Sequence, residues 1–189
     1  MSLKELTIKE HQNAERQNFA RLLMSGQIPK KVYLSYIVNQ HACYTALENH
    51  TKFKLPDDRL KRAKKIQNDI DELKQSSIGK SIWDLTARNL ITKSTKNYIE
   101  HVQNNIHTES DFIAHVYVRY LGDLRGGQMI SKKVPGQGQY YQFEAPEELA
   151  SSIYRILNDD MAEEAKKVFT FATELFIEMY QWYLDEQKE

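Results

Sequence analysis

Residues that interrupt helices are scarce in this chain, and most of the glycines lie close together. The 189 residues include only seven glycines and four prolines, and five of those glycines fall between positions 122 and 138. These two residue types reach about half of their average usage of about 12%. Because glycine and proline are the residues that helices tolerate least, the scarcity favours an all-α fold. We predict a single helical domain spanning residues 1–189.

Charge and cysteine content narrow the function classes. The chain carries 26 lysines and arginines against 26 aspartates and glutamates, so its formal net charge is zero. A general nucleic-acid binder would carry a basic excess, and we expect no nucleic-acid partner. Cys43 is the single cysteine, which excludes a disulfide framework and any cysteine-rich metal or iron–sulfur site.

The chain shows neither a targeting signal nor a membrane segment. The first residues, MSLKELTIKEH, contain no apolar signal core, and no apolar run is long enough to cross a bilayer. No hydrophobic tail follows Leu184, so we also expect no membrane anchor. We therefore expect a soluble, cytoplasmic protein that is a monomer.

Capping residues and helix breakers divide the first half of the chain. Ser2 and Glu5 form a capping-box pattern that starts a helix running to Gly26. A second helix is expected over residues 29–49, and a third segment from 56 to 75 resembles an amphipathic helix solvated on the surface. Gly79 interrupts the chain again, and a loop or short helical piece around Trp83 precedes a helix over residues 94–107.

The second half contains one long helix, one loop and the C-terminal helices. Thr108 begins a capping sequence for a helix over residues 111–133. Residues 134–145 contain a proline and two glycines and are expected to form a flexible loop. Pro146 opens another helix, which is expected to break near residues 158–160 before a final helix that ends near Leu184.

A histidine lies on the predicted apolar face of the first helix. On a continuous helical wheel, His11 falls among Ile8, Ala14, Phe19 and Leu22. Lys4 and Glu15 share the same arc. A neutral imidazole can bind a metal through one nitrogen and donate its other N–H to a carboxylate such as that of Glu15, while Lys4 could meet an anionic group at the edge of a flat ligand.

A plainer interpretation stays open for this helix. His11 could be a core histidine hydrogen-bonded to Glu15, with Lys4 extending to water. The other histidines show no zinc-binding spacing, so a metal at His11 would have a single protein ligand. A single axial histidine is typical of haem iron.

The segment HVYVRYLGDLRGGQMI places three glycines in an otherwise strong helical pattern. Each glycine costs about 1 kcal/mol relative to alanine, so a compensating role is expected. Gly122 and Gly126 lie four residues apart and clear one strip of the helix, which lets the backbone approach a flat object, and Gly127 would allow a kink. The alternative is close packing of two helices at a G-x-x-x-G pair.

Two charged residues flank this strip. Arg119 and Asp123 are one turn apart, which predicts an ion pair at its margin. The glycines follow no predicted strand and precede no lysine, so a phosphate-binding loop is disfavoured.

Four segments resemble the haem oxygenase family. HVYVRYLGDLRGGQ resembles the family signature, and KEHQNAE, residues 9–15, resembles its proximal-histidine motif. YTALE at residues 44–48 and IYR at residues 153–155 also match, in the same order. The resemblance covers residues 3 to about 183. It implies an all-α fold in which haem is sandwiched between a proximal N-terminal helix and a kinked, glycine-rich distal helix.

The resemblance also implies roles for the residues that match these motifs. His11 would be the axial ligand of the haem iron and Glu15 its hydrogen-bond acceptor. Gly122 and Gly126 would bring the distal backbone over the oxygen-binding face, with Gly127 beside them. Three of the remaining matches, Asp123, Arg119 and Tyr117, would hold the water network that protonates iron-bound dioxygen. Lys4 and Arg155 would bind the haem propionates. His115 and Tyr120 would have supporting roles.

The family activity is the oxygen-dependent degradation of haem to biliverdin IXα, carbon monoxide and ferrous iron. Haem would be both substrate and cofactor, and O2 and an external electron donor would be required. The chain looks most like the soluble cyanobacterial, plastid or phage-borne members, which implies ferredoxin as donor and a bilin reductase as a further partner. Two alternatives stay open, a non-catalytic haem carrier or sensor on the same scaffold and a thiaminase-like enzyme with Cys43 as nucleophile.

Two positions depart from the family pattern. Arg125 stands where many members have serine, and its side chain is expected to affect partner docking or stability rather than chemistry. Ser151 replaces a lysine that animal members offer to a propionate, which gives Lys4 and Arg155 more weight. Lys30, Lys31 and Arg125 could receive an acidic redox partner or form an ordinary solvated surface.

Overall fold

The computed structural model describes residues 1–75 and 90–188, and this part of the chain is helical with no strand. The predicted all-α fold is therefore confirmed. Gly79 and Trp83, where the sequence predicts a break and a short helical piece, lie outside the described residues. The helices are α1 (Leu3–Leu6), α2 (Ile8–Glu15), α3 (Asn18–Ser25), α4 (Lys30–Glu48), η1 (Asp58–Leu60), α5 (Ala63–Lys74), α7 (Lys93–Asn104), α8 (Glu109–His115), η2 (Val116–Leu121), α9 (Gly122–Ile130), η3 (Gln139–Tyr141), α10 (Pro146–Tyr154), η4 (Asp159–Met161) and α11 (Ala162–Glu186).

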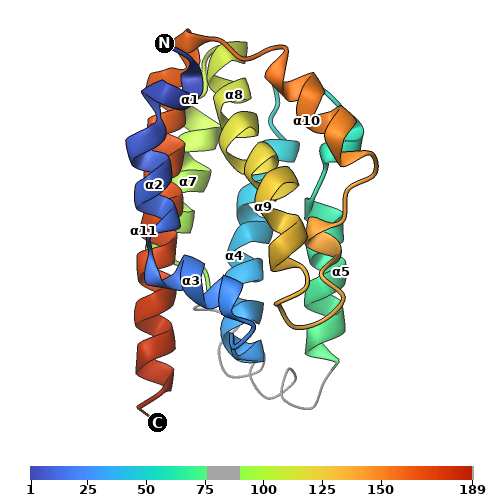
Figure 1. Ribbon diagram of the computed structural model, residues 1–189, viewed down its shortest axis with the longest axis vertical. Helices are drawn as coiled ribbons and strands as arrows, with labels where there is room; N and C mark the ends of the chain where they lie inside the picture. The colour runs from blue at the N-terminus through green and yellow to red at the C-terminus, as the bar shows by residue number, and fades with distance from the viewer. Residues whose placement is uncertain (76–89, 189) are drawn as a thin grey trace.

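Two long helices organise the packing. Helix α4 lies in the centre and packs against α5, α7 and α11, while α11 runs along one side and carries α2, α3, α7 and α8 (Figure 1). Apolar side chains point from α4 in several directions, as expected for a helix surrounded by others. Pro29 precedes its first residue and Asn49 follows its last, which confirms the predicted bounds.

The predicted single N-terminal helix is wrong, because the chain folds into three pieces. The capping box of Ser2 and Glu5 is present, but Thr7 leaves helical geometry at φ −113° and ψ 6° and its buried hydroxyl donates to the Leu3 carbonyl at 2.9 Å. A second break follows at Gln17, whose backbone is extended at φ −62° and ψ 142°. In Figure 1, α3 consequently crosses from the end of α2 toward α9.

Helix α5 is amphipathic as predicted, but it is not a fully solvated surface helix. Ile66, Ile70 and Leu73 are buried on its inner side. Its first turn contains no acidic residue, and the carboxylate of Glu48 in α4 takes that place by accepting the backbone N–H groups of Arg62 and Ala63. A negative charge at a helix N-terminus is favourable, so the basic start of α5 is compensated from another helix.

Residues 134–145 form a fixed connection rather than the expected flexible loop. Tyr140 and Tyr141 are fully buried within it. The carboxylate of Asp69 accepts the backbone N–H groups of Gln139 at 2.9 Å and Tyr140 at 2.8 Å. The buried guanidinium of Arg62 donates to the Tyr140 carbonyl at 3.1 Å. Two buried charged side chains, Asp69 of α5 and Arg62 directly before it, therefore satisfy the loop backbone, which the glycine count alone does not indicate.

The predicted helix over residues 111–133 is present but irregular. Thr108 caps it, with Asp111 completing a capping box. Helices α8 and α9 are joined by the π-helical segment η2, so the irregularity precedes Gly122 instead of lying at Gly127. Such π-helical turns are frequent at functional sites, and they shift the side chains that follow out of the regular α-helical phase.

The C-terminal helices follow the predicted breaks. Pro146 is the first residue of α10, and the interruption near residues 158–160 is the short helix η4. Helix α11 ends at Glu186, two residues beyond the predicted end. No helix in the described part of the chain is both long enough and apolar enough to span a bilayer.

Candidate functional site

The bare strip predicted on α9 opens to free space. A β-carbon built on Gly122 or on Gly126 would meet no atom within 4 Å. Both residues therefore leave room for a ligand that lies against the helix backbone, and neither serves close helix–helix packing.

Gly127 belongs to the core and not to this strip. A β-carbon at Gly127 would lie 2.6 Å from Cδ1 of Tyr141 and 3.1 Å from its Cβ. The residue is buried, so the glycine permits close contact between α9 and the loop that carries Tyr141. Close packing against Tyr141 therefore explains the glycine at position 127, whereas Gly122 and Gly126 border open space.

Asp123 follows Gly122 and points its carboxylate into a cluster of tyrosines. The Tyr44 hydroxyl donates to Oδ2, and the Tyr140 hydroxyl donates to Oδ1 at 3.2 Å. Burial raises the pKa of Asp123 to about 7, although the two hydroxyls and the positive charges of Arg62 and Arg119 act in the opposite direction. This carboxyl group is therefore balanced between its protonated and ionised forms near neutral pH.

The predicted ion pair between Arg119 and Asp123 is wrong. Arg119 is 8% exposed, and its guanidinium carbon lies 3.9 Å from the ring centroid of Tyr98. Its Nη1 donates to the side-chain oxygen of Gln40 at 3.4 Å, and its buried Nε has no partner among the described residues. The π-helical turn that contains Arg119 directs the guanidinium toward α4 and α7, away from the carboxylate.

Gln40 connects these two charged residues. Its Nε2 donates to the hydroxyls of Tyr36 at 3.1 Å and Tyr140 at 3.0 Å, and its Oε1 accepts from Arg119. A polar network therefore links Arg119 to Asp123 indirectly, through Gln40 and Tyr140. It crosses α4, η2, η3 and α9.

His11 is half-exposed rather than core-facing. Its side chain is 41% exposed and that of Glu15 is 64% exposed, with His11 Nε2 lying 3.1 Å from Glu15 Oε1. The helical wheel fails here because the break at Gln17 places Phe19 on a different helix, α3. His11 retains an accessible imidazole with a carboxylate beside it.

The aromatic rings of Phe169 and Tyr117 connect His11 to the π-helical segment η2. The His11 ring centroid lies 5.3 Å from that of Phe169 on α11, and the Phe169 centroid lies 6.3 Å from that of Tyr117. The Tyr117 hydroxyl is also within 3.3 Å of the Thr7 hydroxyl, directly before α2. These contacts bring the N-terminal helices beside the segment that leads to the glycine strip.

The two predicted propionate ligands are exposed and unpaired. Lys4 lies on α1 and Arg155 directly follows α10. Among the described residues neither forms an ion pair, so both cations can receive an anionic group. Ser151 lies exposed on α10, one turn before Arg155.

Other singled-out residues have structural surroundings. His115 is fully buried with its Nδ1 at 2.7 Å from the Tyr98 hydroxyl, and the Tyr120 hydroxyl donates to Glu48 at 3.0 Å. Cys43 is 1% exposed, and burial raises the pKa of its thiol. A buried, protonated thiol is a poor nucleophile, which weakens the thiaminase-like alternative.

Two of the three surface cations considered for partner docking already have partners. Arg125 Nη1 lies 3.1 Å from Glu147, which joins α9 to α10, and Lys31 pairs with Glu186 on α11. This exposed ion pair is consistent with the expectation that Arg125 affects stability or partner docking rather than chemistry. Lys30 has no ion pair in the part of the chain that the structure describes.

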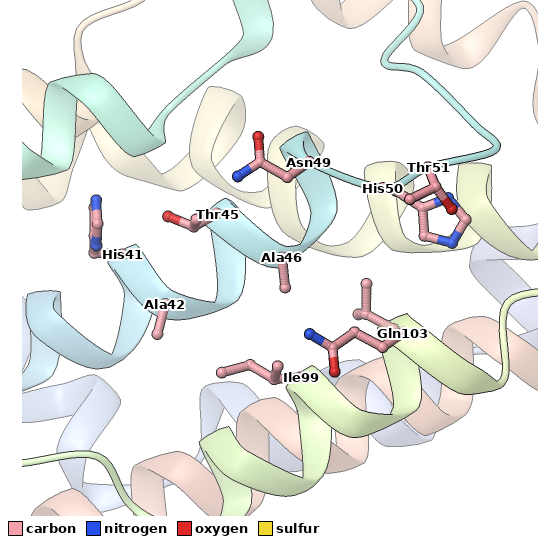
Figure 2. Close-up of a pocket in the computed structure, with 10 residues that line it drawn as sticks. His41, Ala42, Thr45, Ala46, Asn49, His50, Thr51, Ile99 and Gln103 are labelled. Carbon is pink, nitrogen blue, oxygen red and sulfur yellow. The ribbon is translucent and has the colours of Figure 1, made fainter.

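A cavity of about 550 Å³ lies between α4 and α7 (Figure 2) and is lined in part by two residues of the YTALE segment, Thr45 and Ala46. Its walls include His41 and Thr45 from α4 and Ile99 and Gln103 from α7. None of the predicted site residues lines it. The glycine strip, in contrast, is an open face of α9.

The residues that sequence reasoning missed are the partners of Asp123. The sequence singles out Tyr44 only as part of the YTALE match, and Gln40 lies one turn before it. Tyr140 lies in the segment interpreted as a plain loop. The signal for Tyr140 was the unusual pair Tyr140–Tyr141 directly after Gly138, since two adjacent aromatic residues are rarely left in solvent.

Comparison with known proteins identifies one family. The model of the family described as "Heme oxygenase" matches residues 1–178. The heme oxygenase of Pyropia yezoensis is 29% identical over 143 residues, which cover 71% of this chain and 57% of the relative. Heme oxygenase 2 of Macaca fascicularis is 28% identical over 211 residues, covering 95% of this chain and 64% of the relative. The chain thus spans about three fifths of the length of these relatives.

Solved structures share the same fold. The crystal structure of heme oxygenase-1 from Synechocystis in complex with heme superposes with a TM-score of 0.81 at 22% identity, covering 98% of this chain and 94% of that chain. Heme oxygenase from Leptospira interrogans gives a TM-score of 0.73 at 24% identity, covering 94% of this chain and all of that chain. At these identities the likeness concerns the fold.

Proposed function

The chain belongs to the haem oxygenase family, and from that premise we propose that it degrades haem with dioxygen to biliverdin IXα, carbon monoxide and ferrous iron. Haem is the substrate and also the group that binds oxygen. The proposal assigns the proximal side of the ring to α2 and the distal side to α9. It is supported by the open glycine strip, the surroundings of His11, two exposed cations and the carboxyl group of Asp123.

The open glycine strip is the observation that carries the proposal. Gly122 and Gly126 leave a helix backbone uncovered, with free space where their side chains would be. A flat ring can approach such a backbone closely. The strip presents no basic side chain of its own, because the guanidinium of Arg119 is held by Tyr98 and Gln40.

His11 fits the position of an axial ligand. The imidazole is half-exposed, it lies against Phe169, and the Glu15 carboxylate is close enough to hydrogen-bond to the ring. A carboxylate beside one nitrogen orients the ring and favours iron binding through the other. Lys4 and Arg155, which are exposed and without ion pairs among the described residues, would hold the two propionates and thereby set the rotation of the ring.

Asp123 is assigned the handling of protons. Its pKa of about 7 lets the carboxyl group both hold and release a proton at neutral pH. Tyr44 and Tyr140 fix the position of both oxygens, so the group stays set back from the helix surface. The unpartnered Nε of Arg119 is a buried donor that an ordered water in this region would satisfy.

Each part of the site then has a distinct task. Bound haem supplies the iron that binds dioxygen and the ring that is opened. The protein binds and orients the ring, keeps a basic side chain away from the iron, and delivers protons from Asp123, with Arg119 in the same hydrogen-bonded network. Tyr117, whose hydroxyl contacts that of Thr7, would border the ring. Electrons come from an external reductant, for which ferredoxin is the proposed donor, and a bilin reductase would take the product.

The experiment is reconstitution with haemin, followed by addition of ferredoxin and its reductase, or of ascorbate. We expect the Soret band to disappear while the absorption band of biliverdin rises and carbon monoxide is released. A stable complex of haem with oxygen, with no loss of the Soret band, would instead support a carrier or sensor. An absence of any change in the haemin spectrum on adding the protein would contradict haem binding altogether.

A further inference from the structure

Two histidines and a glutamate from three helices meet at one point away from the glycine strip. His101 comes from α7, His115 ends α8, and Glu164 lies in the first turn of α11. Both imidazole Nε2 atoms contact the same oxygen, Glu164 Oε1, with His115 at 3.0 Å and His101 closer. The ligand atoms of the three residues all lie within 4.8 Å of one another.

We propose that His101, His115 and Glu164 bind a divalent transition-metal ion of the zinc type, with water completing its coordination. Two imidazole nitrogens with one carboxylate oxygen are the donor set of many Zn²⁺ and Fe²⁺ sites. Mg²⁺ and Ca²⁺ take oxygen ligands almost exclusively, so the two imidazoles disfavour them. The site is independent of haem and of the proposed activity.

The burial of the three side chains suits a bound ion. His115 is fully buried, and the side chains of Glu164 and His101 are 7% and 11% exposed. Bulk water therefore competes little for these ligand atoms, and the residue types can supply a carboxylate and neutral imidazoles, which are the forms that metals bind.

Tyr98 provides the outer partner that such a site needs. Its hydroxyl lies 2.7 Å from Nδ1 of His115. When Nε2 binds a metal, the imidazole proton lies on Nδ1, and the hydroxyl of Tyr98 can rotate to accept a hydrogen bond from this N–H group. The guanidinium of Arg119 stacks on the ring of Tyr98 and holds this tyrosine in place. Tyr98 can therefore fix the orientation of His115 when no metal is bound.

A cavity gives access to the cluster. It has a volume of about 340 Å³ and His101 forms part of its wall, so water and ions can reach that side chain, which is 11% exposed. The charged residues that line it are Glu10, Glu163, Glu174, Lys166 and Lys167. Three carboxylates against two ammonium groups, with Glu164 behind them, leave an excess of negative charge that favours cation entry.

The competing explanation is a hydrogen-bonded triad that joins α7, α8 and α11 without a metal. In that case both Nε2–H groups donate to Glu164, and the pairing with Lys167 at 3.1 Å completes the carboxylate. Lys167 is 59% exposed and can turn into solvent, so it does not block the site. Only metal binding distinguishes the two explanations.

Cobalt titration of the full-length, haem-free and chelator-treated protein tests the proposal. We expect one Co²⁺ per chain with visible d–d bands, displaced by Zn²⁺, and a rise of the melting temperature with Zn²⁺ concentration. His101→Gln and Glu164→Gln should each weaken binding at least about 100-fold, because each removes a direct ligand. The matched control is His107→Gln, an exposed histidine outside the cluster, which should bind Co²⁺ as the wild type does.

A second measurement uses the wild-type protein, so a folding defect in a variant cannot affect its result. X-ray absorption at the zinc edge of the wild-type protein should show two imidazole nitrogens in the first shell together with oxygen. Absence of saturable Co²⁺ binding would overturn the proposal, as would equal binding in His101→Gln or a first shell of oxygen alone.

Discussion

The hydroxyl of Tyr140 donates a hydrogen bond of 3.2 Å to Oδ1 of Asp123, which ties the connection after α9 to the strip of α9 itself. Tyr140 is fully buried, and its position depends on backbone hydrogen bonds to Asp69. The protonation of Asp123 is therefore controlled by residues that lie far from the glycine strip in the sequence. This relationship yields the first prediction.

Replacing Tyr140 with phenylalanine should move the pH dependence of haem degradation. Burial raises the pKa of Asp123 to about 7, and the Tyr140 hydrogen bond lowers it, so its removal raises that pKa further. If the protonated carboxyl group is the active form, the wild-type rate falls as the pH rises through about 7, and the variant should fall at a higher pH. Single-turnover rates between pH 5 and 9 measure this. An unchanged midpoint, or one at lower pH, would contradict the assignment, and Asp123→Asn should show no such inflection.

Gly127→Ala should destabilise the fold. Its β-carbon would lie 2.6 Å from Tyr141 Cδ1, and the fully buried tyrosine ring cannot move without disturbing the core. Overpacking of this kind costs about 1–3 kcal/mol. Urea unfolding measures the change, and a variant as stable as the wild type would show that Tyr141 adjusts freely.

Gly122→Ala and Gly126→Ala should have the opposite effect on stability. Each added methyl group meets no atom within 4 Å, and alanine favours the helix by up to about 1 kcal/mol relative to glycine. Haem affinity and turnover should fall, because the methyl group occupies the face proposed for the ring. A stabilised variant with wild-type haem affinity, measured by haemin titration, would remove the strip from the site.

Asp69→Asn should loosen the connection between α9 and α10. The carboxylate accepts backbone N–H groups from Gln139 and Tyr140, and the amide keeps only one acceptor oxygen. We expect a loss of about 1–3 kcal/mol in the free energy of unfolding and faster cleavage by trypsin at Lys132 and Lys133. The control is Asp71→Asn, because Asp71 lies exposed on the same helix. This substitution should change the free energy of unfolding by less than about 0.5 kcal/mol. Equal cleavage rates in the two variants would contradict the role of Asp69.

The helix boundaries that the sequence predicts are those with a local cause. Thr108 caps its helix through its own side chain, and Pro29 and Pro146 stand where a helix begins. The break at Gln17, where the backbone is extended, has no such local cause, because glutamine is a good helix former. For that reason, a helical wheel that treats the N-terminal segment as one continuous helix wrongly predicts that His11 faces the core.

The open strip on α9 was predictable from the sequence, but the contacts of the residues around it were not. The spacing of Gly122 and Gly126 correctly predicts an open strip, and the structure adds that Gly127 serves packing. The i, i+4 rule paired Arg119 with Asp123, but the π-helical turn and the tertiary contacts of Gln40 separate them. Contacts such as that between Tyr140 and Asp123 join distant elements, and a local pattern cannot report them.

The most direct test of the central claim is the visible spectrum of His11→Ala with haemin and reductant, recorded with and without imidazole. We expect weakened haem binding and no biliverdin without imidazole, since the axial ligand is missing, and recovery of both when imidazole fills the vacated position. Asp123 remains intact in this variant, so the recovery would depend on the proximal ligand alone. Full biliverdin formation by His11→Ala in the absence of imidazole would contradict the assignment of His11 to the haem iron.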